Sequence, residues 1–424
     1  MSIKTLLHQT ILGSTQSPTL LVFLSLICYQ LVQAAPPLIS KPLPAEVLSI
    51  DNHDLPGKYD GVEIADFAVS PDNNKIVVGF QVGEGGGKFG AWMGEWEIAT
   101  KRLIAKAHLP NPLLDPLSFL AIDNQTMQYT PDGSEIIFQA GPRLYAFNSG
   151  NLSVGYSVSF PDLVERSASE EHSRRFAVSS DGTSLAVFYG QSLYPPKNGV
   201  VRLFVAKTGE EVAHWPAPLQ IQSLSLSPDG KQLLVSALNP LDTTDLLILD
   251  SSTGRIIKSF ESGFGTQLVV GAKLNAMFVD AGHFIASPGP FTDTKGQYLG
   301  RSLKIFDCDT GKVIRELVSE KFGPSGELWV SNKDASVAAL NLWTPHWKRR
   351  LAESSAESAQ LLFFHLNERN PFCALGPLPE RSKESGRQSG FIRFSPDLRS
   401  IGLFFNRKIL VYTTSGCEKP AGAM

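Results

Sequence analysis

The chain has 424 residues, of which 42% are hydrophobic and 19% are charged. This is the composition of a globular protein with enough apolar mass for a large core. Its 38 basic and 41 acidic residues give a formal net charge of −3, and the longest basic run is Lys348-Arg349-Arg350. Because binding to nucleic-acid phosphates needs clustered Lys and Arg, we exclude nucleic acid as a partner.

Residues 1–34 have the pattern of an export signal. Lys4 precedes the apolar stretch Leu20–Ile27, and Val32-Gln33-Ala34 matches a small-x-small cleavage site. The stretch is too short for a comfortable membrane span, and no later segment approaches one. We predict cleavage after Ala34 and a mature chain that is secreted or periplasmic, without a membrane span; the alternatives are an uncleaved anchor or a buried strand.

One pattern repeats along residues 61–416, and its clearest copy starts at Gln222–Leu226. The alternation of side chains in this run predicts a half-buried strand. The tight turn Ser227-Pro228-Asp229-Gly230 follows, in which Pro presets φ, the Asp side chain caps the turn and Gly takes the left-handed exit. A second strand is predicted at Gln232–Ala237 and a third at Asp245–Leu249. A second turn at Asp250–Arg255 then leads to a fourth strand at Ile256–Phe260. Four short antiparallel strands joined in this way make one β-propeller blade.

Both turns recur along the chain. Further copies of the first turn are predicted at Ser70-Pro71-Asp72-Asn73, Thr130-Pro131-Asp132-Gly133, Ser180-Asp181-Gly182, Asn332-Lys333-Asp334 and Ser395-Pro396-Asp397, with a weaker one near Lys273-Leu274-Asn275. Further copies of the second turn are predicted at Ala99-Thr100-Lys101, Lys207-Thr208-Gly209-Glu210 and Asp309-Thr310-Gly311-Lys312. The first turns mark about seven units, roughly 45 to 63 residues apart, whereas an ordinary blade takes about 40 to 45. The excess length predicts long loops.

With these turns, the sequence resembles the WD-repeat family and its bacterial relatives with the Ser-Pro-Asp-Gly turn, over nearly all of the mature chain. The resemblance implies an all-β fold, a single β-propeller of about seven four-stranded blades, and a binding platform in a family whose partners are diverse. The chain departs from the family because the Gly-His pair is absent and the Trp-Asp pair survives only as Trp96-Glu97, Leu249-Asp250 and Phe306-Asp307. We therefore do not expect the hydrogen-bonded network that those pairs form in strong family members.

The last unit contains only three predicted strands, Gly390–Phe394, Ser400–Phe405 and Lys408–Tyr412, before a tail at residues 417–424. A blade without its outer strand would expose a sheet edge, which proteins avoid. The alternating segment Ala45–Ile50, within residues 35–60, can fill this place, and we predict that it pairs with the last blade and closes the ring. The alternative is a disordered linker, because several prolines precede the segment: Pro36, Pro37, Pro42 and Pro44.

Removal of the signal leaves three cysteines, Cys308, Cys373 and Cys417, so at most one disulfide forms within the chain. The repeat map places Cys373 and Cys417 on adjacent blades, which makes them the pair to test first. The alternative is three thiols. The sequence has no CxxC motif or Cys/His cluster, and we predict no zinc site.

In a propeller with this strand order, both kinds of turn lie on one face and the longer connections lie on the other. Long loops on a rigid scaffold are where binding residues tend to lie. Two of these loops carry aromatic side chains that we predict to form a platform for a protein, peptide or glycan partner: Phe291, Tyr298, Trp343, His346 and Trp347. The alternative is that these side chains cover the tops of their own blades.

The sequence shows no catalytic constellation. The Gly-x-Ser-x-Gly elbow of a serine hydrolase is absent. Nothing marks the loop residues Asp115, Asp162 and Asp293 as a glycosidase pair. Thr208-Gly209 followed by Trp215 resembles a turn of quinone-dependent dehydrogenases, but the spacing is two residues too long.

We predict a non-catalytic, extracytoplasmic binding or scaffold propeller that is monomeric and has no cofactor. The alternative is a secreted propeller enzyme acting on carbohydrate or another small molecule, as a hydrolase, lyase or quinone-dependent oxidoreductase. An enzyme would bring carboxylates or a metal cluster together at the centre of the ring, with perturbed pKa values. A scaffold would instead show an apolar patch on its rim.

Overall fold

The computed structural model describes the chain between residues 41 and 417 with gaps, and every structural statement below concerns these residues. They are 41–51, 54, 61–85, 88–109, 126–140, 143–160, 172–191, 199–217, 220–238, 244–261, 274–287, 291–292, 298–299, 303–317, 324–331, 336–341, 360–368, 371–376, 392–405, 408–414 and 417. All of them belong to one unit of the chain, residues 40–424.

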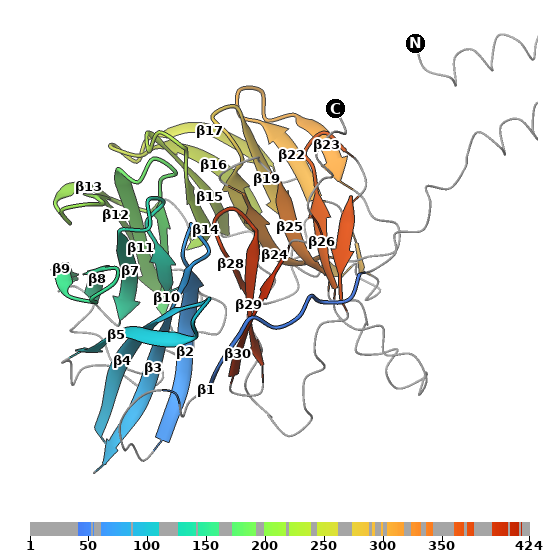
Figure 1. Ribbon diagram of the computed structural model, residues 1–424. Coiled ribbons are helices and arrows are strands. Elements are labelled where there is room, and N and C mark those ends of the chain that lie inside the picture. The colour runs from blue at the N-terminus through green and yellow to red at the C-terminus, as the bar shows by residue number, and fades with distance from the viewer. Residues whose placement is uncertain are drawn as a thin grey trace, which may run out of the picture. The chain divides into compact units, whose positions relative to one another are not determined.

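Seven four-stranded antiparallel sheets, each one blade, make up the described fold (Figure 1). From the innermost strand outward, blade 1 holds β2 (Gly61–Val69), β3 (Lys75–Gly85), β4 (Lys88–Glu97) and β5 (Arg102–Leu109); blade 2 holds β6 (Met127–Tyr129), β7 (Glu135–Ala140), β8 (Arg143–Asn148) and β9 (Val154–Ser159). Blade 3 holds β10 (His172–Val178), β11 (Ser184–Gln191), β12 (Val200–Val205) and β13 (Glu211–Pro216); blade 4 holds β14 (Gln220–Leu226), β15 (Gln232–Leu238), β16 (Thr244–Asp250) and β17 (Ile256–Glu261). Blade 5 holds β18 (Asn275–Phe278), β19 (His283–Ser287), β22 (Leu303–Asp307) and β23 (Val313–Leu317); blade 6 holds β24 (Pro324–Val330), β25 (Val337–Asn341), β26 (Gln360–Phe364) and β27 (Cys373–Leu375). Blade 7 holds β28 (Ile392–Phe394), β29 (Ser400–Phe405), β30 (Lys408–Thr413) and β1 (Leu48–Asp51), and a separate hairpin pairs β20 (Phe291–Thr292) with β21 (Tyr298–Leu299).

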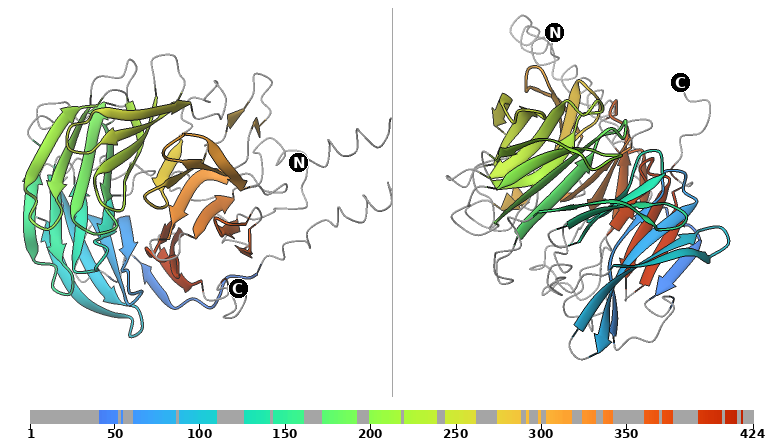
Figure 2. Two further views of the ribbon diagram at one scale, coloured as in Figure 1. Left: turned by 90° about the horizontal axis from the view of Figure 1, so that it is seen from above. Right: turned by 90° about the vertical axis from the view of Figure 1, so that its left-hand side faces the viewer.

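The blades follow one another around a common centre, which confirms the predicted all-β propeller (Figure 2). β2 lies beside β6 on one side and beside β28 and β29 on the other, so the first blade meets the last. In blades 1 to 6 the first-to-second and third-to-fourth connections lie at one end of the strands, which we call the turn face, and in blade 7 the first-to-second connection lies there; the opposite end is the loop face. Within the described residues, no helix is long and apolar enough to cross a membrane.

The first turn of a blade is locked by its Ser or Thr and Asp side chains. In blade 4, Ser227 N donates a hydrogen bond to Gln232 O at 2.9 Å, and Ser227 Oγ donates to Asp229 Oδ1 at 2.7 Å. Gly230 takes a φ of 69°, a left-handed conformation that costs little without a Cβ. The hydroxyl-to-carboxylate bond recurs in four other first turns: Ser70–Asp72, Thr130–Asp132, Ser179–Asp181 and Ser395–Asp397. In each of these turns the Asp side chain also accepts a hydrogen bond from a following backbone N–H, which confirms the predicted cap by Asp.

The predicted position of the first turn in blade 5 was wrong. The sequence placed a weak copy near Lys273-Leu274-Asn275, but β18 begins at Asn275 and the turn lies at residues 279–282. In this turn Asp280 Oδ1 accepts a hydrogen bond from Gly282 N at 2.7 Å. The turn has Asp but neither Ser nor Pro before it, so it lacks the pattern that marked the other copies. The predicted turn at Asn332-Lys333-Asp334 lies outside the described residues.

The N-terminal strand closes the ring, as predicted. β1 pairs antiparallel with β30, from Leu48 opposite Val411 to Asp51 opposite Lys408, and becomes the fourth strand of blade 7. Leu48 and Ile50 are buried and belong to the core cluster between blades 7 and 1. The first strand of the described chain therefore completes the last blade.

The segment before β1 also pairs with blade 6. Lys41 forms a parallel bridge with Leu375 of β27. Lys41 N donates a hydrogen bond to Ala374 O, and Gly376 N donates to Lys41 O, both at 2.9 Å. The extended N-terminal segment thus adds backbone to the outer edge of blade 6 before it joins blade 7.

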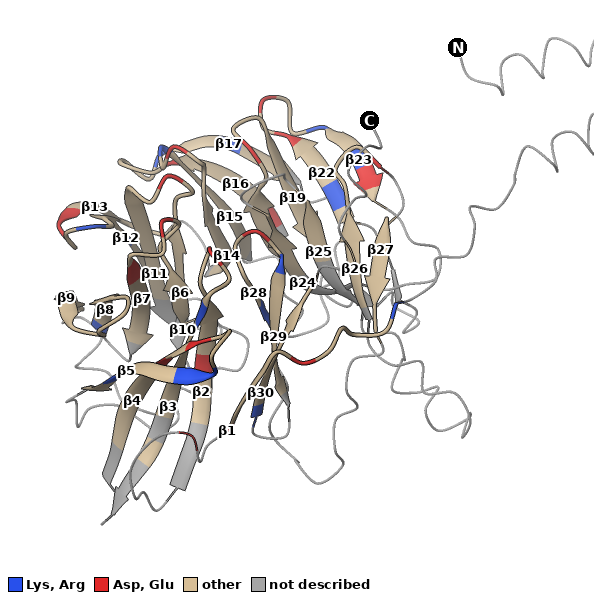
Figure 3. Ribbon diagram, in the orientation of Figure 1, with Lys and Arg blue, Asp and Glu red and all other residues tan. Residues whose placement is uncertain are grey.

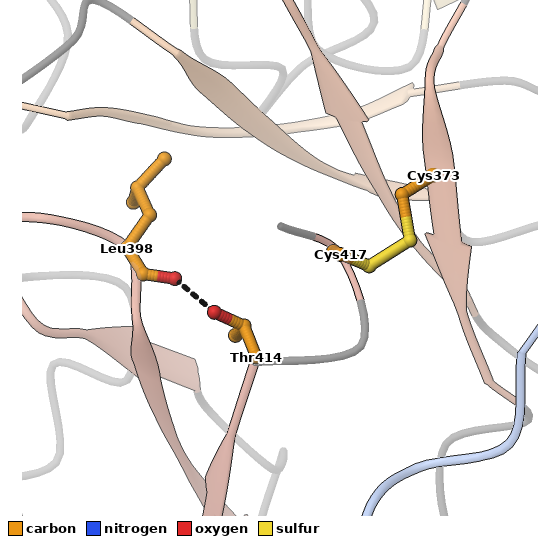
Figure 4. The surroundings of a disulfide bond; sticks show 4 residues. All are labelled: Cys373, Leu398, Thr414 and Cys417. Atoms are coloured by element: carbon orange, nitrogen blue, oxygen red, sulfur yellow. Dashed lines mark hydrogen bonds between the residues drawn. A yellow bond between two sulfur atoms is a disulfide. The ribbon is translucent and has the colours of Figure 1, made fainter. Parts of the chain in front are cut away.

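The C-terminal end is fixed to the same strand by a disulfide. Cys417, which follows β30, is bonded to Cys373 of β27, 44 residues away in sequence (Figure 4). Nearby, Thr414 Oγ1 donates a hydrogen bond to Leu398 O at 2.7 Å. The disulfide joins the pair that the repeat map placed on adjacent blades, and Cys308 is a buried free thiol.

The core lies between neighbouring blades. Phe67 on β2 is fully buried in the cluster that joins blades 7 and 1. Gly402 on β29 makes room for this ring, because a Cβ at that position would overlap the ring of Phe67. The close approach of the last and first blades therefore depends on one glycine and one aromatic side chain.

Candidate functional site

A buried carboxylate, Asp66, lies on the innermost strand of blade 1. The pairing of β2 with β3 shifts register between Ile64 and Asp66, and such a bulge re-aims the side chain that follows it. Asp66 Oδ1 accepts hydrogen bonds from Arg393 Nε of β28 at 3.0 Å and from Phe67 N at 2.9 Å. Asp66 Oδ2 accepts from Thr126 N at 2.7 Å and from Thr126 Oγ1 at 2.9 Å. One carboxylate therefore joins blades 7, 1 and 2.

The contacts of Asp66 determine what it can do chemically. Only 1% of the residue is exposed, and its charge is balanced by the guanidinium of Arg393. A general base must reach a proton on the substrate, whereas this carboxylate already accepts four hydrogen bonds from the protein. The arrangement is suited to holding three blades together.

A second set of polar contacts joins the innermost strands of blades 3, 4 and 5. Arg175 Nε on β10 donates to Gln222 O on β14 at 2.9 Å, and Gln222 Oε1 accepts from Leu274 N at 3.3 Å. Ser223 Oγ accepts from Ala276 N of β18 at 3.0 Å. We call these two sets together the inner ring: Asp66, Thr126, Arg175, Gln222, Ser223, Leu274, Ala276 and Arg393.

Glu95 on β4 is another buried carboxylate, between blades 1 and 2. Its oxygens accept hydrogen bonds from Tyr129 OH at 2.9 Å, Ser149 Oγ at 2.7 Å and Gly150 N at 2.5 Å, and Lys75 Nζ lies 4.0 Å from Oε1. Burial, together with the charge of Glu95, raises the pKa of Tyr129 well above its usual value, so the phenol remains a donor. The cluster uses its own polar groups and ties the two blades together.

The first turns place Asp residues on the turn face, where acidic residues colour the ribbon red (Figure 3). Burial acts to raise the pKa of Asp72, Asp132 and Asp181, but hydrogen bonds from the Ser or Thr hydroxyl and from following N–H groups outweigh it and lower the pKa. The Ser227 hydroxyl is the main cause of the lowered pKa of Asp229. These carboxylates are engaged in their own turns. In the part of the chain that the structure describes, no group of three His, Cys, Asp or Glu residues could hold a metal ion.

Trp215, which with Thr208-Gly209 resembles a quinone-enzyme turn, packs against the next blade. Its ring covers Gly254 in the second turn of blade 4, and its Nε1 donates to Ser251 O at 3.3 Å. Gly254 has a φ of 68°, and a Cβ there would overlap the indole ring. The same aromatic-on-glycine contact joins two other blade pairs: Tyr156 on Gly209 and Phe260 on Gly311. The Trp therefore has a structural role between blades.

The structure places two residues of the predicted aromatic platform by their backbone. The hairpin β20–β21 lies in the connection between β19 and β22, with Phe291 opposite Leu299 and Thr292 opposite Tyr298. Phe291 and Tyr298 thus belong to facing strands of one hairpin on the loop face. Other candidate residues lie outside the described residues: Trp343, His346, Trp347, Asp115, Asp162 and Asp293.

The sequence analysis missed a set of exposed apolar side chains. The large hydrophobic residues that are exposed in the described part of the chain are Val154, Val212, Ile256, Ile257, Val313 and Ile314. All lie within the first two residues of the outer strands of blades 2 to 5. We call this set the outer arc. An apolar pair directly after a Thr-Gly turn, as in Gly254-Arg255-Ile256-Ile257, is the signal that could have identified it.

No family model and no curated protein matches this sequence. Among solved structures, the fold is similar to the WD40 domain of coronin from Toxoplasma gondii, with a TM-score of 0.50 and 10% sequence identity, over 88% of this chain and 87% of that chain. The fold is that of a WD40-like seven-bladed β-propeller. The C-terminal WD40 domain of Sif2 aligns with a TM-score of 0.47 and 11% identity, over 88% of this chain and 99% of that chain. At such identities the WD40-like propeller is a likeness of fold alone.

Proposed function

We propose that this WD40-like propeller is a non-catalytic, extracytoplasmic scaffold that binds a protein, peptide or glycan partner through its loop face. The observation that carries the proposal is the hairpin β20–β21, which is added to the four-stranded frame of blade 5 and holds Phe291 and Tyr298 on facing strands. Aromatic residues are enriched among the side chains that dominate binding energy. Trp343, His346 and Trp347 belong to the same proposed site.

Two features of the described residues support this proposal. The inner-ring carboxylate Asp66 and the interblade carboxylate Glu95 are both hydrogen-bonded within the protein, which favours a structural role for the buried acids. The outer arc is an exposed apolar feature of the rim, which is expected of a scaffold.

The disulfide supports the proposed location. Disulfides persist in oxidising compartments and are rare in the cytosol, and Cys373–Cys417 joins two blades of the ring. N-terminal sequencing of the exported protein tests this point, and we expect the mature chain to begin at Ala35. A chain that retains residues 1–34 would contradict the proposed processing.

A thermal-shift screen of the exported protein tests the binding role. The panel contains short peptides, oligosaccharides, divalent metals and quinones, because a ligand that binds only the folded state stabilises it by about 2.7 kcal/mol at a hundredfold excess over its Kd. We expect a peptide or oligosaccharide to raise Tm, and Phe291→Ala/Tyr298→Ala to abolish the shift. The matched control is Ile256→Ala on the outer arc, which should keep it.

The outcomes separate the two classes of function. A shift by a metal or quinone, or turnover of an oligosaccharide in the panel, would contradict the non-catalytic proposal. A peptide or glycan shift that persists in Phe291→Ala/Tyr298→Ala and in Trp343→Ala/Trp347→Ala would contradict the proposed site.

A further inference from the structure

The second turn of blade 2, between β8 and β9, contains the triplet Asn151-Leu152-Ser153. Asn-x-Ser, with any residue except Pro in the middle, is the acceptor pattern for an N-linked glycan in an exported chain. Two backbone hydrogen bonds of 2.9 Å hold the turn, from Leu152 N to Asn148 O and from Asn148 N to Ser153 O. The backbone of the acceptor triplet is therefore held in a defined conformation.

Leu152 anchors this turn in the core and leaves Asn151 in solvent. Leu152 is 3% exposed, belongs to the core cluster that joins blades 1 and 2, and takes a φ of 53°. Asn151, the residue before it, is exposed. A glycan is bulky and hydrophilic, so its acceptor side chain has to be directed away from the core. The turn meets this condition.

The amide nitrogen of Asn151 is the atom that would carry the glycan. Asn151 Oδ1 accepts hydrogen bonds from Ser153 N and from Ser153 Oγ, both at 2.8 Å. Because a backbone N–H needs an acceptor, the amide atom that faces Ser153 N is the oxygen. Nδ2 is the other atom of the amide group, and it makes no hydrogen bond within the described residues. The reacting atom of the acceptor is therefore not engaged by the protein.

A second triplet of the same pattern, Asn124-Gln125-Thr126, has a different environment. Its hydroxyl residue, Thr126, belongs to the inner ring, where both its N–H and its hydroxyl donate to Asp66. Asn124 lies outside the described residues. Of the two triplets, Asn151-Leu152-Ser153 is the one whose acceptor the structure places in solvent.

The strand that follows the turn of Asn151 has an edge without charges. β9 contains no Lys, Arg, Asp or Glu, whereas β13, β17 and β23 each contain at least one such residue. In the described sheets β9 pairs only with β8, and its first residue, Val154, is 53% exposed. Proteins protect an exposed strand edge with charges or by covering it. Since Asn151 closely precedes Val154, a glycan on Asn151 lies next to this edge.

We propose that Asn151 carries an N-linked oligosaccharide, which covers the outer edge of blade 2. In the transfer, Asn151 Nδ2 forms a bond to the anomeric carbon of an oligosaccharide that is linked to a polyprenyl diphosphate. The bond from that carbon to the diphosphate oxygen breaks, the polyprenyl diphosphate leaves, and one amide proton passes to a base of the transferase. The site lies on the turn face, so the glycan leaves the loop face open to its partner. The inference rests on the export in the proposed function, because such transferases act on exported chains.

Mass spectrometry of the exported protein, purified from its source cells, tests the site. We expect the peptide that contains Asn151 to carry an oligosaccharide, and a peptide-N-glycosidase to convert this residue to Asp. Ser153→Ala should abolish the modification and Ser153→Thr should retain it, because both leave Asn151 in place and only the second keeps a hydroxyl. Asn148 is the internal control: it lies in the same turn, has Gly150 in place of the hydroxyl residue, and should stay unmodified.

Light scattering of concentrated protein tests the role of the glycan at the edge. Asn151→Gln should aggregate faster than the unaltered protein, and Asn151→Gln/Val154→Lys should not, because a charge then protects the edge. Equal aggregation of Asn151→Gln and the unaltered protein would overturn the covering role.

N-terminal sequencing of the same sample separates the failure of this inference from the failure of the proposed export. An unmodified Asn151 in a chain that begins at Ala35 overturns the glycan site alone. An unmodified Asn151 in a chain that retains residues 1–34 contradicts both the glycan site and the export.

Discussion

Blades 6 and 7 and blades 2 to 5 end differently at their outer edges. In blades 6 and 7 the N-terminal segment supplies outer backbone, and a disulfide ties the chain beyond β30 to β27. In blades 2 to 5 the outer strands carry exposed Val and Ile side chains. Outer strand edges are therefore covered by additional backbone where the first and last blades of the ring meet. This difference predicts that the junction of blade 7 with blades 6 and 1, which we call the seam, contributes more to stability than the outer arc does.

Side chains of residues that are distant in sequence join the blades at the seam. Arg393 pairs with Asp66, and Asn73 Nδ2 donates to Asp397 Oδ2 at 3.0 Å, so the first turns of blades 1 and 7 are joined. Between the blades of the arc, an aromatic ring on a glycine recurs, and polar contacts of the inner ring join blades 3, 4 and 5. We expect mutations to cost more at the seam, because the first and last blades of the ring meet there.

The largest expected effect is at Phe67. Phe67→Ala removes a fully buried ring from the seam and should lower the free energy of unfolding by about 3–5 kcal/mol, as measured by urea unfolding. Phe260→Ala is the matched control in blade 4, where the ring is only partly buried, and its loss should be smaller. Equal losses would show that the seam is no more sensitive than the arc.

Loss of the disulfide should have the second-largest effect on stability. In the chain-entropy description, the cross-link between Cys373 and Cys417 should contribute about 2–4 kcal/mol, and Cys373→Ser/Cys417→Ser should lose this amount. Reductant should lower the Tm of the unaltered protein to that of the double variant and should leave the variant unchanged. A fall of Tm in the reduced variant would place the redox sensitivity elsewhere.

Low pH should lower the free energy of unfolding through the turns near the seam and through those on the arc alike. The pKa values of Asp72, Asp132, Asp181 and Asp229 are lowered in the folded state, so their stabilisation is fully present above the unfolded value of about 3.9 and is lost as pH falls through the lower folded values. Urea unfolding between about pH 5 and pH 2 should show this loss. Asp72→Asn near the seam and Asp229→Asn on the arc should each make this acid-induced loss of stability smaller, and by a similar amount. A smaller loss in only one of the two variants would contradict the shared turn chemistry.

The smallest expected effect is on the outer arc. Val212→Ser should change the free energy of unfolding by less than about 0.5 kcal/mol, because 54% of the residue is already exposed. Thermal unfolding measures this change. A larger loss would show that the arc belongs to the core of its blade.

Local turn chemistry is the reason that so much of the fold was predictable. Ser227-Pro228-Asp229-Gly230 specifies a turn through hydrogen bonds within a few residues, and the strand pattern of blade 4 followed from it. The turn around Asp280 was missed because it keeps the Asp and loses the preceding Ser and Pro. The missing fourth strand of blade 7 was predictable because an unpaired sheet edge is costly.

Hydrogen bonds between side chains of different blades were not predictable. Asp66 and Arg393 are separated by 327 residues, and their pairing requires both closure of the ring and the bulge in β2. Of the predicted platform, Phe291 and Tyr298 lie on one hairpin, but its relation to Trp343, His346 and Trp347 depends on loop geometry that no repeat specifies. The repeat determines the four strands of each blade, whereas the candidate site lies in long connections that are not part of the repeat.

The attachment of both chain ends to β27 has a mechanical consequence. Tension applied between Lys41 and Cys417 would reach β27 directly, through the backbone bridge at one end and the Cys373–Cys417 bond at the other. The chain between Gly376 and Cys417 would bear no load while the bond is intact. Reduction would let this segment extend by roughly 3.4 Å per residue. We therefore expect the disulfide to protect the last blade from such a force.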